Sequence, residues 1–474
     1  MEIAGRKVLV IGAARSGIAS ARFLARRGAI VALNDRKPLA EWPAEALELK
    51  TLGVGHIAGD PPSWLLDQID LVVVSPGVPT KAIPIRYADR RGAEVIGEIE
   101  LASRFLRGRV VAVTGTNGKT TTTALIGEML RDAQLNVQVG GNIGQALVSL
   151  AESSRDDGWS VVEVSSFQLE TIVDFHPTVA AVLNVTPNHM DRYDSLTDYA
   201  AAKHRVFTNQ TAGDVAILNA DDQIVSSWAE GLRAHVVQFS TKRQLDEGLF
   251  LRGNDLVSRT KDGERVLLMR DEMRLRGTHN VENVLAAMAA GLACGAAPES
   301  LRETVRHFQP VEHRLEEVAE IKGVRFFNDS KATSVDATMK ALEAFAGERG
   351  KVVLILGGRG KQAPYSPLAP LIRELVRKMI LMGEDAPAIE RELNTAAPFE
   401  QATDMHDAVA RAFAAAQPGD VVLLAPACAS FDMFESFEHR GRVFKEEVSS
   451  LGFRVSSSRQ PETPNSKLET GSGS

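Results

Sequence analysis

The sequence predicts an α/β protein of three domains, each built on a largely parallel sheet with helices. Two observations lead to this prediction. A chain of 474 residues is too long for one hydrophobic core. Apolar runs of strand length alternate along it with stretches of helical spacing, as in parallel sheets covered by helices. We expect domains at 1–107, 108–309 and 310–455, and a disordered Ser/Pro/Thr/Gly-rich tail at 456–474.

Composition narrows the class of protein. A net charge of −7 argues against a protein that coats nucleic acid. The two cysteines, Cys294 and Cys428, lie far apart in no metal-binding spacing, which favours a reducing cytoplasm. The small-apolar run 284–297 is interrupted by glycine and is too short to cross a membrane, and no signal-type segment leads the chain. We therefore expect a cytoplasmic protein with no nucleic-acid partner and no membrane insertion.

The first domain should present a nucleotide-binding edge. Expected strands at 7–11, 30–34 and 71–74 each end in a turn or a polar residue. The glycine turn after the first strand and Asp35 after the second resemble a Rossmann-like dinucleotide fold, but Ala14 replaces the second glycine of that fingerprint. A nicotinamide site and a ligand-free domain are both weaker interpretations than a general edge for a phosphate-bearing nucleotide.

The central domain should hold a nucleoside triphosphate. An apolar strand at 110–113, a glycine-bearing loop at 114–118 and a helix at 120–133 form the arrangement in which backbone amides and a lysine hold phosphates. Val113 occupies the position of the first glycine of an ordinary P-loop, so this loop is a shortened variant. The alternative is a Gly/Thr-rich turn with a surface lysine. The expected ATP-binding residues here are Gly115, Thr116, Asn117, Gly118, Lys119, Thr120 and Thr121, with either threonine hydroxyl on the magnesium.

Four other central residues have chemistry suited to this site. Glu163 ends the expected strand 159–164, where a carboxylate commonly serves the nucleotide's magnesium. His189 follows the expected strand 180–185 and is either a metal ligand or a surface polar group. Lys203 lies on the expected helix 197–207 and is by itself an ordinary helix lysine. Asn280 opens a helix, as an adenine or ribose contact or as part of a cap.

The third domain repeats the pattern of strands that end in polar groups. Strands expected at 324–327, 351–356 and 420–424 lead into the segments 328–333, 357–361 and 426–430. This pattern is typical of a binding edge. Three such domains indicate a cleft between them.

The motifs together resemble the Mur ligase family over about residues 3–453. The Gly115–Thr120 segment is similar to the family's ATP loop, and segments 163–170, 188–191, 279–280 and 313–314 follow in the family's order. Segments 328–333, 356–361 and 426–430 resemble the branch that adds D-glutamate. Two departures stand out, because Arg359 replaces a frequent acidic residue and Arg15-Ser16 replace an apolar-Thr pair.

The resemblance implies an ATP-dependent, amide-forming ligase of peptidoglycan precursor synthesis, active as a monomer. It would phosphorylate the alanyl carboxylate of UDP-N-acetylmuramoyl-L-alanine to an acyl phosphate, which the D-glutamate amine would attack. Two magnesium ions would serve it, the second on His189 and on Lys203 as its CO₂-derived carbamate, with Asp191 orienting His189. The implied catalytic residues are Lys119, Glu163, His189, Lys203 and Arg314.

Further residues are implied for the substrates. Arg314, Asp329 and Asn280 would contact the transferring phosphate, the ribose and the adenine of ATP. The UDP-sugar would contact Arg15, Ser16, Asp35, Arg36, Ser75, Pro76, Gly77 and, near its carboxylate, Asn142. D-Glutamate would contact Thr333, Lys361, Ser430 and Phe437.

Several alternatives stay open at this point. Another Mur ligase would add L-lysine, meso-diaminopimelate or a dipeptide, and a folylpolyglutamate synthetase shares the ATP loop. A nicotinamide-dependent dehydrogenase is disfavoured by Ala14 and by the ATP loop. A non-catalytic nucleotide-binding regulator is disfavoured because the implied catalytic residues are all present.

Overall fold

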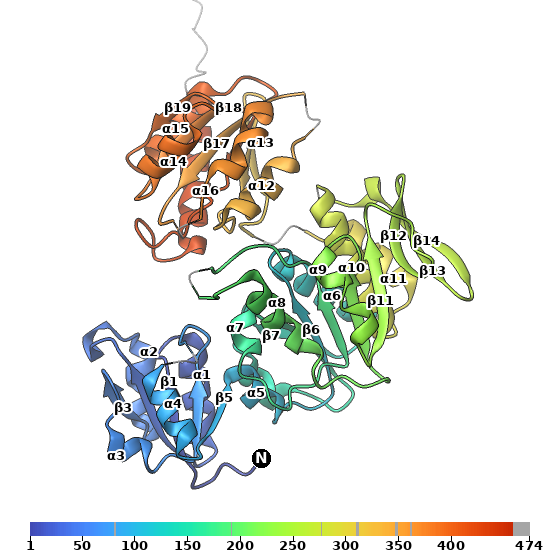
Figure 1. Ribbon diagram of the computed structural model, residues 1–474. Coiled ribbons are helices and arrows are strands. Elements are labelled where there is room, and N and C mark those ends of the chain that lie inside the picture. Colours follow the sequence, from blue (N-terminus) through green and yellow to red (C-terminus); the bar gives the residue numbers. More distant parts are fainter. Residues whose placement is uncertain are drawn as a thin grey trace, which may run out of the picture. The chain divides into compact units, whose positions relative to one another are not determined.

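The computed structural model describes residues 1–79, 82–190, 192–275, 277–309, 312–346, 349–360 and 363–457. Two compact units divide the chain, Met1–Val311 and Glu312–Ser474, and the first contains two sheets (Figure 1). Asp191 and Lys361 lie outside the described residues, as does the tail from residue 458 onward. Within the described ranges, no helix combines the length and apolar character that a membrane span needs.

The N-terminal sheet is parallel throughout, with strand order β3-β2-β1-β4-β5. From β1 the chain first adds β2 and β3 on one side and then adds β4 and β5 on the other side. The carboxyl ends of β1 and β4 therefore flank the switch point at which such sheets bind ligands. The elements are β1 (Lys7–Ile11), α1 (Arg15–Arg26), β2 (Ile30–Asp35), α2 (Ala44–Leu47), β3 (Gly55–Ala58), α3 (Ser63–Leu66), β4 (Leu71–Val74), α4 (Ile83–Arg90), β5 (Glu94–Gly97) and α5 (Glu98–Ser103).

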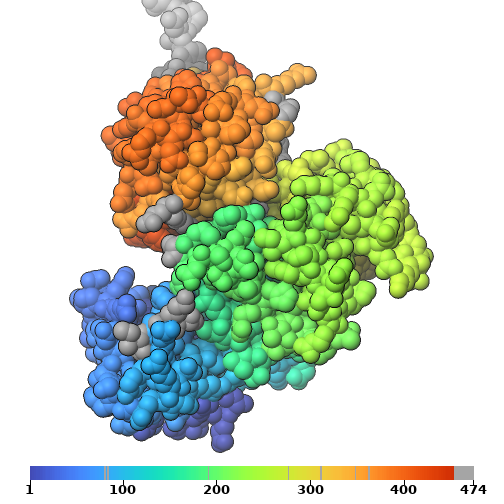
Figure 2. All heavy atoms as spheres, viewed as in Figure 1, coloured from blue at the N-terminus to red at the C-terminus, as the bar shows by residue number. Residues whose placement is uncertain are grey.

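The central sheet has nine strands in the order β14-β13-β12-β11-β10-β9-β6-β8-β7. Strands β6 to β12 run parallel, whereas β12, β13 and β14 form an antiparallel meander that the sequence interpretation did not anticipate. The β13–β14 hairpin projects from the yellow-green edge of this domain (Figures 1 and 2). Its strands are β6 (Arg109–Thr114), β7 (Val137–Gly141), β8 (Trp159–Glu163), β9 (Val179–Val182), β10 (Val215–Asn219), β11 (His235–Ser240), β12 (Gly248–Arg252), β13 (Asp255–Thr260) and β14 (Gly263–Met269).

Alternate residues of the central strands enter two different cores. In β6, Val111 and Val113 pack with α6, α10 and α11, whereas Val110 and Ala112 join the core on the opposite face. This second core continues through α5 to α1 and the N-terminal sheet, which is why the two sheets form one compact unit. The helices are α6 (Lys119–Asp132), α7 (Ser166–Leu169), α8 (Leu196–His204), α9 (Gln223–Ser226), α10 (Thr278–Ala293) and α11 (Pro298–His307), with 3₁₀ turns η3 (Leu147–Ser153) and η4 (Arg205–Phe207).

The C-terminal unit is a sheet of order β15-β16-β20-β17-β18-β19, parallel except for β15. Helices α12, α13 and α14 pack on one face, and α15 and α16 on the other. The elements are β15 (Glu316–Ile321), β16 (Val324–Asn328), α12 (Val335–Glu343), β17 (Val352–Gly357), α13 (Ala369–Leu375), β18 (Val376–Met382), α14 (Ala386–Leu393), β19 (Phe399–Gln401), α15 (Met405–Ala415), β20 (Val421–Leu424) and α16 (Phe437–Ser457).

Three expected element boundaries were wrong by two or more residues. Strand β9 ends at Val182 instead of residue 185, because the chain there turns to meet the phosphate loop. The helix expected to reach residue 207 is α-helical only to His204 and then tightens to the 3₁₀ turn η4. Helix α16 continues to Ser457, two residues into the expected tail.

Candidate active site

The phosphate loop joins β6 to α6. Gly118 is the N-cap residue of α6 and has φ of 83°, in the left-handed region that favours glycine. A Cβ there would lie 2.2 Å from Asn283 Oδ1, so a side chain has no room. The loop therefore brings its backbone close to α10 and leaves the amides at the start of α6 available for an anion.

Asn184 holds this loop in shape, a role that the sequence interpretation missed. Its Oδ1 accepts from the backbone N–H of Thr116 at 3.1 Å and of Asn117 at 2.8 Å. Thr116 Oγ1 in turn accepts from the N–H of Thr186 at 3.0 Å. Asn184 follows β9 at the same sheet edge as the loop, and that position is the signal that could have identified it.

Two lysines converge on one backbone carbonyl. Lys119 Nζ donates to the oxygens of Gly115 and Thr116 at 2.9 and 2.8 Å, and Lys203 Nζ donates to Gly115 O at 2.8 Å. Lys203 is 1% exposed, and its ammonium lies 4.5 Å from the centre of the Tyr199 ring. Burial and then the charge of Lys119 hold the pKa of Lys203 well below its usual value, while Glu163 opposes the shift. This arrangement favours a neutral Lys203 amine.

Glu163 is a buried carboxylate with both oxygens hydrogen-bonded. Thr120 Oγ1 donates to Oε2 at 2.7 Å, and Asn142 Nδ2 donates to Oε1 at 2.8 Å. Of the two threonines left open by the sequence, Thr120 is the one that contacts this carboxylate. The structure thus brings together Thr120, Asn142 and Glu163 from three elements of the central domain.

His189 lies on the loop that follows β9, with φ of 56°. Its ring packs edge-on against Phe167, with ring centres 4.9 Å apart. Arg192, which the sequence interpretation did not single out, lies 4.3 Å above the same Phe167 ring. Arg192 also donates to the carbonyls of Gly77 and Val78 at 3.2 and 2.9 Å, and so links this loop to the N-terminal domain.

A pocket of about 700 Å³ lies at the carboxyl ends of β1, β2 and β4. Asp35 is fixed there by the backbone N–H of Ala13 at 2.8 Å, and the exposed Arg36 faces Asp60 at 3.7 Å. The volume suits a nucleotide-sized ligand. All eight residues expected to contact the UDP-sugar line this one pocket, namely Arg15, Ser16, Asp35, Arg36, Ser75, Pro76, Gly77 and Asn142.

Asn280 is buried near the start of α10. Its Oδ1 accepts from Asn283 Nδ2 at 3.0 Å, and Asn283 Oδ1 accepts from Thr122 Oγ1 at 3.3 Å. These contacts join α10 to α6 behind the phosphate loop. Asn280 therefore has a structural contact in addition to the nucleotide contact expected of it.

The expected residues of the C-terminal unit follow its strand ends. Asp329 comes after β16, and burial raises its pKa to about 7 while the Arg314 guanidinium opposes the rise. The buried Ser430 follows β20, and Phe437 begins α16, with Lys331 Nζ 5.2 Å from its ring centre. Thr333 lies in the segment between β16 and α12.

Arg440 connects these segments and was missed from the sequence. It is 1% exposed, and its guanidinium donates to Ser330 Oγ at 3.0 Å, Ser330 O at 2.8 Å and Cys428 O at 3.1 Å. Burial lowers its pKa to about 10. On a helix this residue resembles any surface arginine, so only the fold reveals that it holds the two strand-end loops together.

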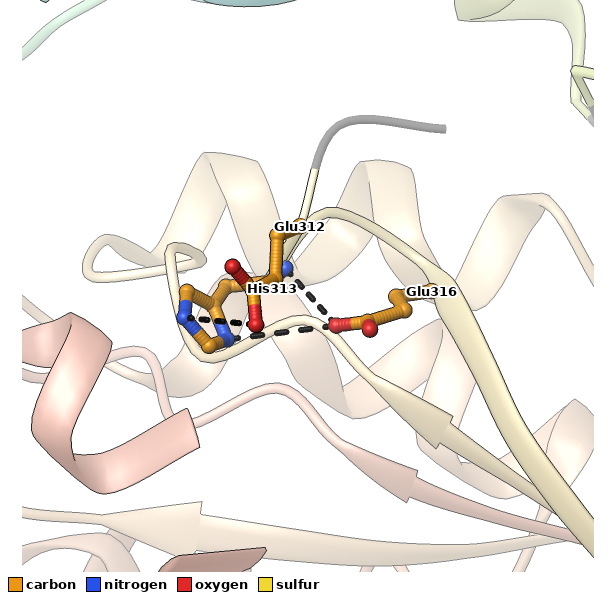
Figure 3. A group of neighbouring side chains, drawn as sticks. All are labelled: Glu312, His313 and Glu316. Carbon is orange, nitrogen blue, oxygen red and sulfur yellow. Dashed lines mark hydrogen bonds and ion pairs between the residues drawn. The ribbon is translucent and has the colours of Figure 1, made fainter. Parts of the chain in front are cut away.

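Glu312, His313 and Glu316 gather at the start of the C-terminal unit (Figure 3). Their atoms are close enough to bind a metal, but Lys445 Nζ already contacts Glu312 at 2.9 Å and Glu316 at 2.5 Å. Glu316 also accepts from the backbone N–H of His313 at 3.0 Å. The lysine offsets part of the charge of the two carboxylates, so the group is best explained as an ion-pair cluster that fixes the segment carrying Arg314.

The chain matches three domain families, one after another along its sequence. They are the Mur ligase MurD-like N-terminal domain at residues 6–97, the Mur ligase middle domain at 113–291 and the Mur ligase glutamate ligase domain at 313–428. The chain is 48% identical to the UDP-N-acetylmuramoylalanine–D-glutamate ligase of Solibacter usitatus over 95% of this chain and 99% of that protein. It belongs to the Mur ligase family.

Other relatives agree with this assignment. The chain is 47% identical to the ligase of the same name from Koribacter versatilis, over 94% of this chain and 98% of that one. It also resembles the structure of MurF ligase from Thermotoga maritima in complex with ADP, with a TM-score of 0.61 over 95% and 96% of the two chains. At 16% identity, this likeness shows that the two chains share a three-domain α/β fold.

Proposed function

We propose that this Mur ligase joins D-glutamate to the alanyl carboxylate of UDP-N-acetylmuramoyl-L-alanine, converting ATP to ADP and phosphate in peptidoglycan precursor synthesis. The observation that carries the proposal is the near-complete match to relatives named for this activity, at 47–48% identity. The nicotinamide, regulator and folylpolyglutamate alternatives account for neither this match nor the three Mur domains.

The phosphate loop would hold the triphosphate. The amides at the start of α6 would contact phosphate oxygens, and Lys119 would exchange its two carbonyl acceptors for the β- and γ-phosphates. A charge-assisted contact between an ammonium and a phosphate is stronger than one between an ammonium and a neutral carbonyl. Asn280 would contact the adenine, while Arg314 and Asp329 would contact the phosphate and the ribose.

The residues beside the loop fit a magnesium ion. Thr120 and Glu163 supply hard oxygen ligands, and their hydrogen bonds already place them side by side. When bound, Mg²⁺ supplies positive charge that screens the phosphate and carboxylate oxygens from each other. Asn142 would hold Glu163 in orientation for this role.

Lys203 could bind a second magnesium ion only if its side chain became an anion. A neutral amine adds to CO₂, forming an N–C bond and releasing a proton, and the product carries an anionic oxygen. Burial and Lys119 favour that neutral amine. We propose that Lys203 carries this carbamate and binds a second magnesium together with His189.

Substrate binding would use both compact units. The pocket of about 700 Å³ would take the uridine nucleotide, and Thr333, Lys361, Ser430 and Phe437 would bind D-glutamate. Since these residues belong to two units, the reaction would require the units to close around the substrates. Small-angle scattering with and without substrates should show compaction, and an unchanged radius of gyration would contradict this step.

The proposal is tested by ATP-dependent phosphate release with UDP-N-acetylmuramoyl-L-alanine as first substrate. D-Glutamate, L-glutamate, L-lysine and meso-diaminopimelate are offered in parallel, and we expect release with D-glutamate alone. Release with a different amino acid would assign the chain to another Mur ligase activity. No release with any of them would reject the proposed nucleotide substrate.

A further inference from the structure

We propose that Arg15 is a positioning residue that couples the nucleotide pocket to the metal-binding carboxylate Glu163. This inference rests on the proposed function, because it assigns Glu163 to magnesium. It gives Arg15 a role beyond the substrate contact expected from sequence, at a position where this chain departs from the apolar-Thr pair.

Arg15 lies at the first turn of α1, and its guanidinium reaches the turn after β7. Nη1 donates to Gly144 O at 2.9 Å and Nη2 donates to Asn142 O at 3.2 Å. The same side chain lines the nucleotide pocket together with Asn142. One cation therefore contacts both the pocket and the turn of the central domain.

Asn142 carries this link to the metal site. Its backbone N–H donates to Glu163 O at 2.9 Å, and its Nδ2 donates to Glu163 Oε1 at 2.8 Å. The other oxygen of Glu163 accepts from Thr120 at the start of α6. A continuous set of hydrogen bonds thus runs from Arg15 through Asn142 and Glu163 to Thr120.

A buried acid supports the position of Arg15 electrostatically. Glu98, at the start of α5, accepts from the backbone N–H of Val148 at 2.7 Å, a few residues beyond the turn. The charge of Arg15 counteracts the effect of burial on this carboxyl. Arg15 therefore donates to two carbonyls and interacts electrostatically with one carboxyl, which restricts its orientation.

The competing explanation is that Arg15 only contacts the UDP-sugar. In that case Arg15→Ala would raise the KM for the UDP-sugar and leave the magnesium requirement for ATP binding unchanged. If Arg15 positions Asn142, its loss would loosen Glu163 even when no UDP-sugar is present. The two explanations therefore differ in an assay that contains only enzyme, nucleotide and magnesium.

The test is equilibrium binding of a fluorescent ATP analogue over a magnesium titration, without UDP-sugar or amino acid. We expect Arg15→Ala to raise the half-saturating magnesium concentration about fivefold, with Arg15→Lys intermediate because it can serve only part of the two-carbonyl contact. Arg36→Ala is the matched control, since it removes another guanidinium that lines the same pocket. It should raise the KM for the UDP-sugar without moving the magnesium requirement.

A double-mutant cycle with Asn142→Ala completes the test. If Arg15 acts through Asn142, the double variant should resemble Asn142→Ala alone. A magnesium requirement within twofold of the unsubstituted protein in both Arg15 variants would overturn the inference, as would full additivity. Because no UDP-sugar or amino acid is present, failure of the proposed function in the phosphate-release assay is a separate result.

Discussion

The basic side chains near the candidate sites of the two compact units have different partners. Around the phosphate loop, Lys119 and Lys203 both donate from Nζ to the backbone carbonyl of Gly115. In the C-terminal unit, Lys445 is neutralised by two carboxylates, and Arg440 is enclosed by backbone carbonyls and a hydroxyl. The first arrangement brings two lysine side chains from different helices to one loop, whereas the second fixes loops. We infer that the lysines at the loop are placed to act on a ligand, whereas Arg440 and Lys445 hold the surrounding segments in place.

A large effect is expected from Lys119→Ala, which removes the lysine that begins α6 directly after the loop. ATP affinity should fall about 100-fold, or about 3 kcal/mol, since a charge-assisted contact to the phosphates is lost. Isothermal titration with ATP and magnesium measures it. Unchanged affinity would remove Lys119 from the phosphate site and erase the contrast between the units.

Lys203→Ala should separate binding from chemistry within the first unit. We expect ligase activity to fall at least about 100-fold while the affinity for ATP stays within about threefold, because only the second metal site is damaged. Steady-state rates and ATP titration on the same preparation give both values. An equal loss of ATP binding would contradict the carbamate assignment.

Arg440→Met should act within the second unit, through the two loops that Arg440 holds together. Its loss leaves the acceptors at Ser330 and Cys428 without their donor, so we expect the free energy of unfolding to fall by about 3 kcal/mol and the KM for D-glutamate to rise. Denaturant unfolding and kinetics measure the two effects. An unchanged KM for D-glutamate would show that Arg440 does not act through the acceptor loops.

A pH-dependent effect concerns Glu98, beside the first-unit site. Burial raises the pKa of Glu98 to about 7, so the folded state binds a proton that the unfolded state releases above about pH 4.5. Stability supplied by the protonated carboxyl is therefore lost as pH rises from about 4.5 to 7. Glu98→Gln should remove this dependence, worth up to about 3 kcal/mol, in unfolding measured at pH 5 and pH 8. Parallel pH curves for both proteins would contradict it.

Sequence patterns predicted the strand ends better than the contacts between them. The loop, Lys119, Glu163 and the eight pocket residues follow strands, and parallel strands bring their ends to one edge. Asn184 contacts Thr116, and Arg440 contacts Ser330. Both partners are distant in the chain, so no local sequence pattern indicates these contacts. The antiparallel meander β12–β14 was missed because its strands are half-exposed and lack a chemical motif.

The burial of Lys203 is another feature that the sequence could not predict. On the sequence it is an ordinary helix lysine, and its role came from the family resemblance. The fold adds the physical reason, since the side chain is enclosed against Tyr199 and close to a second ammonium. Desolvation depends on neighbours from several elements, so no spacing rule could have predicted it.

The most direct test of the division between the units is positional isotope exchange in ATP labelled with ¹⁸O at the β,γ-bridge. The enzyme is incubated with labelled ATP and UDP-N-acetylmuramoyl-L-alanine, without an amino acid. If the first-unit site forms an acyl phosphate before the amine is needed, the label should scramble into non-bridging β-phosphate positions, and Lys203→Ala should abolish this while Arg440→Met retains it. Scrambling that appears only when D-glutamate is added would contradict the account.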